Sequence, residues 1–208
     1  MLSSHLLWLA PDVALISSRL KETQMKLGYL TQYSKQEVQQ AADIGFDALE
    51  CHARSWPIHE TRSKSKLADI AKEVREETQA LGIEITAIAN YDVSILTQQT
   101  RSAVAALKRV INFTAQLGVP VMTAMAGRIP DKPIEDSINQ FKKVWGKAAK
   151  MADDAGIKIA FENWPGLGGY PITGKNIAYC PAYWDMMFEA VPDQSIGSFG
   201  VQSVSGQP

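Results

Sequence analysis

The sequence has few of the residues on which several common classes of protein depend. Of its 208 residues, two are cysteines and three are histidines. Cys51 and Cys180 form no C-x-x-C pair and no disulfide framework, so we predict a reducing compartment, the cytoplasm. Three histidines are too few for a site built mainly from imidazoles.

The sequence also lacks an excess of charge of one sign and a long apolar run. Its 21 Lys and Arg residues against 22 Asp and Glu residues give a net charge of −1, without the basic excess typical of nucleic-acid binding. The first apolar run is interrupted at Pro11-Asp12, well short of the roughly 20 residues of a membrane span. No basic segment precedes it, as one would in a secretory signal. We therefore expect no nucleic-acid or membrane partner, and an appendage in residues 1–24.

What the sequence does contain is a repeated helix-to-strand junction. The repeats read "DIGFDALE", "ALGIEITAIAN", "QLGVPVMTAMAG" and "DAGIKIAFEN", and their glycines, at positions 45, 82, 118 and 156, are separated by 37, 36 and 38 positions. Each glycine stands where a helix should end, and glycine tolerates the left-handed conformation of such an ending. A period of this length indicates a repeated supersecondary unit.

The segments around these glycines predict alternating helices and strands. Before the last glycine, apolar residues recur at 134, 138, 141, 145, 148 and 152, which is helical spacing. Ser34 and Glu37 fit a capping box at the start of the first helix. Short runs rich in Ile, Val, Ala and Phe begin near 26, 48, 83, 119 and 157 and predict strands. This alternation implies βαβ units and a parallel sheet. No G-x-G-x-x-G follows the first strand, which favours a (β/α) barrel over a doubly wound sheet.

Polar residues follow four of the predicted strands, in "ECHARSW", "ANYD", "AGR" and "ENW". In such barrels, functional groups gather at the carboxyl ends of the strands. Glu162 ends an otherwise apolar strand, and burying a carboxylate costs several kcal/mol unless a cation or hydrogen-bond donors meet it. We therefore predict a functional Glu162 at the mouth of the barrel. The alternative is a solvated carboxylate, or one paired with Lys158 or Arg128.

The order and spacing of these segments resemble the xylose isomerase-like TIM barrels, a superfamily of sugar-phosphate isomerases and epimerases. The resemblance covers about residues 25–197, and its most specific pieces are "FEN" and "ANYD". It implies a divalent metal ion, Mn²⁺, Mg²⁺ or Co²⁺, bound by Glu162, because oxygen ligands suit these ions. It also implies proton transfer through an enediolate on a small sugar, sugar phosphate or polyol, with Glu162 as metal ligand and catalytic proton carrier.

The sequence departs from the family pattern near its end. The family carries "D-P-S-H" on strand six, whereas here "SFGVQSVSGQP" follows Gly197, and no Asp, Glu or His occurs after Asp193. The segment from Met25 to Pro208 is also shorter than the roughly 200 residues of a complete barrel. We therefore expect a C-terminally truncated α/β domain in residues 25–208, a partial (β/α)8 TIM barrel of about five to six βα units. A weak metal site and self-association through the open sheet edges should follow.

Further polar residues at the predicted strand ends are candidates for substrate binding. They are His52, Arg54, Trp56, Asn90, Arg128 and Asn163. His52 and Arg54 fall on one side of an extended segment, where Trp56 could stack on a sugar face. The alternatives are an ordinary polar loop, turn residues and, for Arg128, neutralisation of nearby carboxylates. We interpret Glu50 as a hydrogen-bonding group inside the barrel, and residues 165–181 as a lid or a surface loop.

Rival functions stay open at this point. A keto-inositol dehydratase needs much the same proton abstraction. An abasic-site endonuclease needs a trinuclear zinc centre with several histidines, which three cannot supply, and the near-neutral charge argues against a grip on phosphate backbone. The rival from a different class is a non-catalytic barrel remnant or binding fragment.

Overall fold

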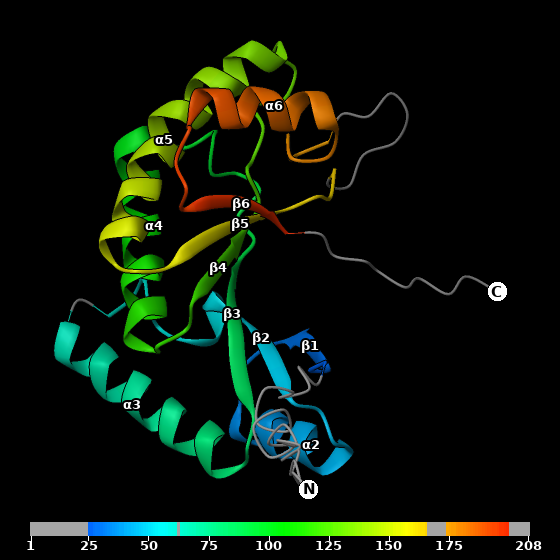
Figure 1. Cartoon of the computed structure of the whole chain (residues 1–208). Helices are drawn as coiled ribbons and strands as arrows, with labels where there is room; N and C mark the ends of the chain where they lie inside the picture. The colour runs from blue at the N-terminus through cyan, green and yellow to red at the C-terminus, as the bar shows by residue number, and fades with distance from the viewer. Residues whose placement is uncertain (1–24, 62, 166–173, 200–208) are drawn as a thin grey trace, which may run out of the picture.

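Six parallel strands and their connecting helices form an open barrel (Figure 1). The computed structural model describes residues 25–61, 63–165 and 174–199. The strands are β1 (Gly28–Thr31), β2 (Ala48–His52), β3 (Glu84–Asn90), β4 (Val121–Ala124), β5 (Lys158–Glu162) and β6 (Ile196–Phe199). The helices are α2 (Lys35–Ile44), α3 (Lys64–Ala80), α4 (Thr100–Gln116), α5 (Ile134–Asp154) and α6 (Pro181–Ala190), with a 3₁₀ turn, η1 (Ala53–Ser55), after β2.

The strands lie in the order β1 to β6, and each is parallel to the next. Within the described residues β6 does not pair with β1, so the sheet stays open. Figure 1 shows α3, α4 and α5 to the left of the sheet and α6 across the top, above β6. The predicted partial (β/α)8 TIM barrel with a parallel sheet is confirmed.

The predicted helix ends are also confirmed. Gly45, Gly82, Gly118 and Gly156 have φ angles of 95°, 69°, 72° and 70°, the left-handed conformation that favours glycine. At the start of α2, Ser34 Oγ accepts a hydrogen bond from the Glu37 amide at 3.1 Å. The Glu37 carboxylate accepts a hydrogen bond from the Tyr29 hydroxyl at 2.9 Å instead of one from the Ser34 amide. Only the bond to the Ser34 side chain of the predicted capping box is therefore formed.

The apolar core lies between the helices and the convex face of the sheet. Fully buried strand residues on this face are Leu49, Ile88, Met122, Ile159 and Phe161, and the helices add Leu107, Phe113, Phe141 and Trp145. Because side chains alternate along a strand, the residues between these point to the concave face. That alternation decides which side chains can take part in a site.

Several predictions from the sequence concern residues that the structure does not describe. Residues 1–24, the final residues 200–208, and residues 166–173 of the predicted lid or surface loop lie outside the described ranges. Of the helices that are described, none combines the length and the apolar composition needed to cross a bilayer.

Candidate active site

Glu162 is the last residue of β5 and belongs to the concave face. Its neighbour Phe161 is buried on the helix side, with its ring 5.5 Å from that of Phe141 and 4.7 Å from that of Trp145 between centroids. Glu162 is half-buried, and its Oε2 is a buried atom without a hydrogen-bond partner among the described residues. Burial, and after it the negative charge of Glu50, raises the pKa of the Glu162 carboxyl.

The basic residues considered as partners of Glu162 are occupied elsewhere or form no pair with it. Lys158 Nζ donates to the backbone carbonyl of Gln194 at 3.2 Å. No ion pair between described residues involves Glu162 or Arg128. The Glu162 carboxylate is therefore partly removed from water without a neighbouring cation. Burying its negative charge in this way costs free energy unless a bound ligand supplies the missing positive charge.

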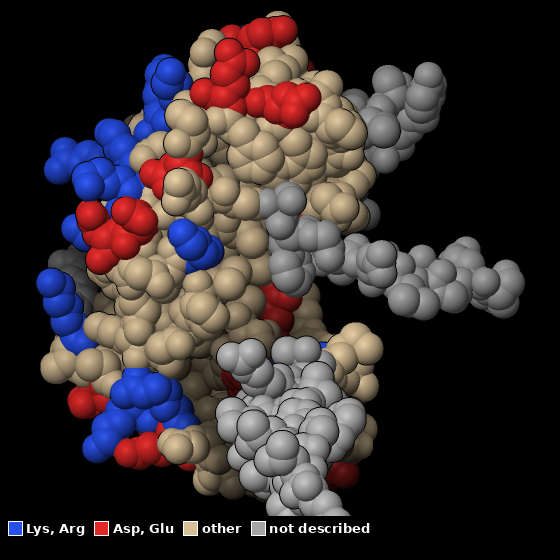
Figure 2. Space-filling view, viewed as in Figure 1, with Lys and Arg blue, Asp and Glu red and all other residues tan. Residues whose placement is uncertain are grey.

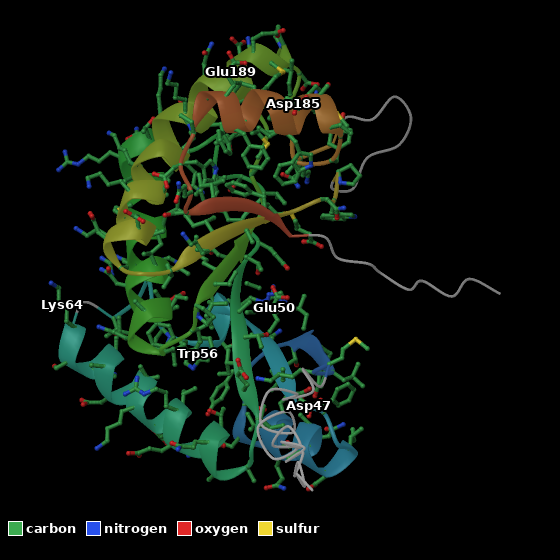
Figure 3. All side chains as sticks on the ribbon, in the orientation of Figure 1. Asp47, Glu50, Trp56, Lys64, Asp185 and Glu189 are labelled. Atoms are coloured by element: carbon green, nitrogen blue, oxygen red, sulfur yellow. The ribbon has the colours of Figure 1, made fainter. Side chains whose placement is uncertain are left out.

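Glu50 provides a second carboxylate on the same face. It lies on β2 between Leu49 and Cys51, both fully buried on the helix side. Figure 3 shows Glu50 on the open side of the sheet. Its Oε1 accepts hydrogen bonds from the Tyr91 hydroxyl at 2.9 Å and from the Thr123 hydroxyl. The interpretation of Glu50 as a hydrogen-bonding group inside the barrel is confirmed.

Tyr91 joins Glu50 to His52 at the ends of β2 and β3. The rings of Tyr91 and His52 meet edge to face, with centroids 5.8 Å apart and an interplanar angle of 83°. Burial raises the pKa of Tyr91, and the charge of Glu50 adds to this, so the phenol keeps its proton and donates. Burial and then the charge of Arg54 lower the pKa of His52, so its imidazole is neutral at neutral pH.

Asn176 fixes the ends of β4 and β5 relative to each other. Its side chain is fully buried. Its Oδ1 accepts from the Ala126 amide at 3.0 Å, and its Nδ2 donates to the backbone carbonyls of Glu162 at 2.9 Å and Trp164 at 2.6 Å. Asn176 touches the backbone of Glu162 and so acts as a positioning residue for it.

The other predicted residues differ in where the structure places them. His52 and Arg54 line a hollow of about 500 Å³ at the carboxyl ends of β1 and β2, together with Thr31 and Gln32. Asn90 is half-buried and shares the strand alternation of Ile88, which places it on the helix side of β3 and not on the concave face where a substrate-binding role was predicted. Asn163 is exposed. Arg128 is half-buried, its Nε has no partner among the described residues, and its charge acts on the phenol of Tyr179.

The prediction that Trp56 stacks on a sugar is wrong. The side chain is only 6% exposed, and its ring lies 5.2 Å from the rings of both Tyr33 and Phe113. Figure 3 shows Trp56 on the helix side of the sheet. The 3₁₀ turn η1 carries the chain away from the concave face before Trp56, so this ring belongs to the core.

Sequence reasoning gave no site role to Tyr91, Thr123 or Asn176. Tyr91 lies inside the quoted "ANYD", and Thr123 is the one hydroxyl residue in the apolar strand "VMTA". Either could have been found as a polar residue on the concave alternation. Asn176 gave no such signal, because its contacts with Ala126, Glu162 and Trp164 span 50, 14 and 12 residues of the sequence.

The described residues supply only part of a metal site. Glu162 fits one ligand position, since its Oε2 is buried and unpaired. Glu50 has already engaged one oxygen with Tyr91 and Thr123. Within the described ranges, no three His, Cys, Asp or Glu side chains come together in a group that could hold a metal ion.

Comparison with known proteins identifies the family. A profile described as xylose isomerase-like TIM barrel matches residues 38–192, most of the chain. The chain belongs to this family, and the predicted resemblance is confirmed. No match was found among curated protein sequences.

Solved structures of the same fold include a xylose isomerase domain protein from Planctomyces limnophilus, with 20% sequence identity and a TM-score of 0.60 over 83% of this chain and 62% of that one. A D-psicose 3-epimerase with D-tagatose from Clostridium cellulolyticum H10 has 15% identity and a TM-score of 0.64 over 84% and 62%. A D-tagatose 3-epimerase-like protein has 18% identity and a TM-score of 0.65 over 84% and 64%. The chain therefore spans a little under two thirds of the length of these proteins.

Proposed function

We propose that this chain carries part of the active site of a divalent-metal-dependent isomerase or epimerase of small sugars or sugar phosphates. The observation that carries the proposal is Glu162, a desolvated carboxylate without a partner among the described residues, at the carboxyl end of β5. This edge of the sheet is where barrels of this kind place their functional groups. The epimerases among the structural relatives support the choice of substrate class.

Glu162 is the residue that would hold the metal ion, with Mn²⁺, Mg²⁺ or Co²⁺ suited to its oxygen donors. When bound, such an ion stabilises negative charge that develops on the substrate oxygens beside the carbon that loses its proton. One free carboxylate and one engaged carboxylate make a small ligand set, so we expect weak binding by the described residues alone.

The chain's own residues have separate tasks in this proposal. The Glu162 carboxylate accepts and returns the substrate proton, as general base and then general acid. Neutral His52 hydrogen-bonds a sugar hydroxyl, and Arg54 does so from the rim of the same hollow. Asn163 orients a further hydroxyl, and Arg128 binds an anionic group of the substrate.

The proposal extends to the substrate, the compartment and self-association. We propose a small sugar or polyol as substrate and the cytoplasm as compartment. We also propose self-association through the open edge of the sheet. In the described residues no strand lies beyond β1, and Met25, Leu27 and Leu30 near this edge are exposed apolar side chains. Unpaired edges of this kind invite pairing with another chain.

Calorimetric titration with Mn²⁺ tests the proposal. We expect saturable binding that Glu162→Gln weakens by at least about tenfold, because the substitution removes the charged ligand oxygens. Glu189→Gln is the matched control, since Glu189 is an exposed carboxylate on α6 (Figure 3) and its loss should leave binding unchanged. Equal binding by the wild type and Glu162→Gln would refute the role of Glu162.

Solvent proton exchange separates an enzyme from a binding fragment. The wild type, incubated with Mn²⁺ and a ketohexose in D₂O, should introduce deuterium at the carbon next to the carbonyl, as followed by NMR. Glu162→Gln should abolish this exchange. Metal binding without any exchange over a panel of ketohexoses and their phosphates would favour the non-catalytic alternative.

A further inference from the structure

A second cavity lies outside the barrel, between α3 and α4. Its volume is about 730 Å³, within the range of roughly 300–1,000 Å³ that small-molecule sites occupy. We name it the α3–α4 groove. Ala105 and Ala115 of α4 line it, and such short side chains leave the space between the two helices unfilled. The groove opens on the helix-covered side and does not include the residues of the candidate active site.

The rim of the α3–α4 groove is basic. Lys64 from the start of α3 and Lys108 and Arg109 from the middle of α4 line the groove, and none of the described lining residues is an Asp or Glu. The Arg109 guanidinium also donates to the backbone carbonyl of Thr61 at 3.4 Å. The described ion pairs involve none of these three residues. The whole chain has a net charge of −1. The basic rim therefore reflects where these three residues lie, and not an overall excess of basic residues. Figure 2 shows most of the visible Lys and Arg side chains on the left, helix-covered side, and Figure 3 places Lys64 there.

The inner wall of the groove is apolar but contains one unsatisfied acceptor. Phe113 is fully buried and Leu67 half-buried, and both line the groove. Gln116 lines it as well, and its Oε1 is a buried atom without a hydrogen-bond partner among the described residues. The apolar surface that the groove offers to a ligand comes from Leu67, which is half-buried, and from Ala105 and Ala115.

We propose that the α3–α4 groove binds a small amphiphilic anion. Such a ligand has a phosphate, sulfonate or carboxylate for Lys64, Lys108 and Arg109, and an aromatic or short aliphatic body that packs on Leu67 and the two alanines. A concave surface lined by charges of one sign concentrates ions of the opposite sign. The proposal does not depend on the proposed isomerase function.

The probe for this site is 8-anilinonaphthalene-1-sulfonate, which combines a sulfonate and an aromatic body. We expect its fluorescence to report saturable binding that weakens with salt. The double variant Lys108→Gln/Arg109→Gln should weaken binding by at least about tenfold, since each charge-assisted contact has an effect of this order. The control Lys72→Gln/Lys150→Gln removes the same charge from exposed lysines in surface ion pairs and should bind as the wild type does.

A second variant tests the cavity without changing its charge. Ala105→Phe starts from an exposed residue at the groove, so it can fill the space without disturbing the core. It should abolish binding of the probe while its thermal unfolding stays as in the wild type. Phenyl phosphate should displace the probe from the wild type. Binding that survives both Lys108→Gln/Arg109→Gln and Ala105→Phe would overturn the proposal. Displacement by an oligoglutamate peptide but not by phenyl phosphate would overturn it in favour of a peptide surface.

Discussion

The two faces of the sheet use the same strands for different purposes. On the helix face, Leu49, Ile88 and Ile159 are fully buried in an apolar core. On the concave face, Glu50 and Glu162 are half-buried carboxylates, and Glu50 accepts hydrogen bonds from the hydroxyls of Tyr91 and Thr123. One residue step along a strand therefore separates apolar side chains that form the core from polar side chains that face the inside of the barrel.

Phe161 and Glu162 are neighbours in β5 on opposite faces of the sheet, so substituting each of them tests the comparison directly. Phe161→Ala should lower the free energy of unfolding by about 3–5 kcal/mol, since it opens a cavity beside Phe141 and Trp145. Glu162→Gln should leave stability within about 1 kcal/mol of the wild type, because no hydrogen bond or ion pair of Oε2 is lost. Urea denaturation measures both. A loss of stability in Glu162→Gln as large as that in Phe161→Ala would break the comparison.

Asn176, which connects the ends of β4 and β5, should have an intermediate effect on stability. Asn176→Ala leaves the Ala126 amide and the Glu162 carbonyl without their partner. We expect a loss of about 1–3 kcal/mol in the free energy of unfolding, the cost of unsatisfied buried groups. Asn163→Ala is the control, because Asn163 is exposed and its loss should stay within about 0.5 kcal/mol. Equal unfolding of the two variants in urea would show that Asn176 does not hold the site together.

The sequence predicts local features of this fold well, because they depend on neighbouring residues. The ends of α2, α3, α4 and α5 follow from single glycines, and the strands begin within two residues of the predicted positions. Glu162 was found in the same way, as a carboxylate at the end of an apolar strand. These signals need no knowledge of what packs against the segment.

The features that the sequence did not predict depend on distant contacts. Asn176 acts on Ala126, 50 residues away, and Tyr91 and Thr123 converge on Glu50 from 41 and 73 residues away. Trp56 follows the polar residues of β2 in sequence, but the turn η1 directs it beneath the helices. Only the assembled sheet shows which strand-end residues face each other.

Tyr91 and Tyr33 allow the two faces to be compared with the same substitution on each. Tyr91 donates to Glu50 at 2.9 Å on the concave face, and Tyr33 donates to Glu77 at 3.0 Å next to the helix-side ring of Trp56. Each Tyr→Phe variant should lose about 1 kcal/mol of stability for its hydrogen bond. Only Tyr91→Phe should also change the affinity for Mn²⁺ in calorimetry. The same affinity change in Tyr33→Phe would show that the two faces are not separate.

The smallest expected effect is a dependence of stability on pH. Because the pKa of Glu162 is raised in the folded protein, the folded state holds its proton more tightly than the unfolded state does. The stabilising contribution is complete below the ordinary glutamate pKa of 4.5 and is lost as the pH rises through the higher folded value. In EDTA, the wild type should therefore lose stability in this window relative to Glu162→Gln, whose side chain does not titrate.

The most direct test of the central claim is an NMR titration of the Glu162 carboxyl carbon in metal-free protein, assigned by its absence in Glu162→Gln. We predict that the Glu162 carboxyl has a pKa above 4.5 and that this pKa is lower in Glu50→Gln, since that variant removes the nearby negative charge. A Glu162 carboxyl that titrates at or below 4.5 and does not respond to Glu50→Gln would contradict a desolvated, unpaired carboxylate at the mouth of this barrel.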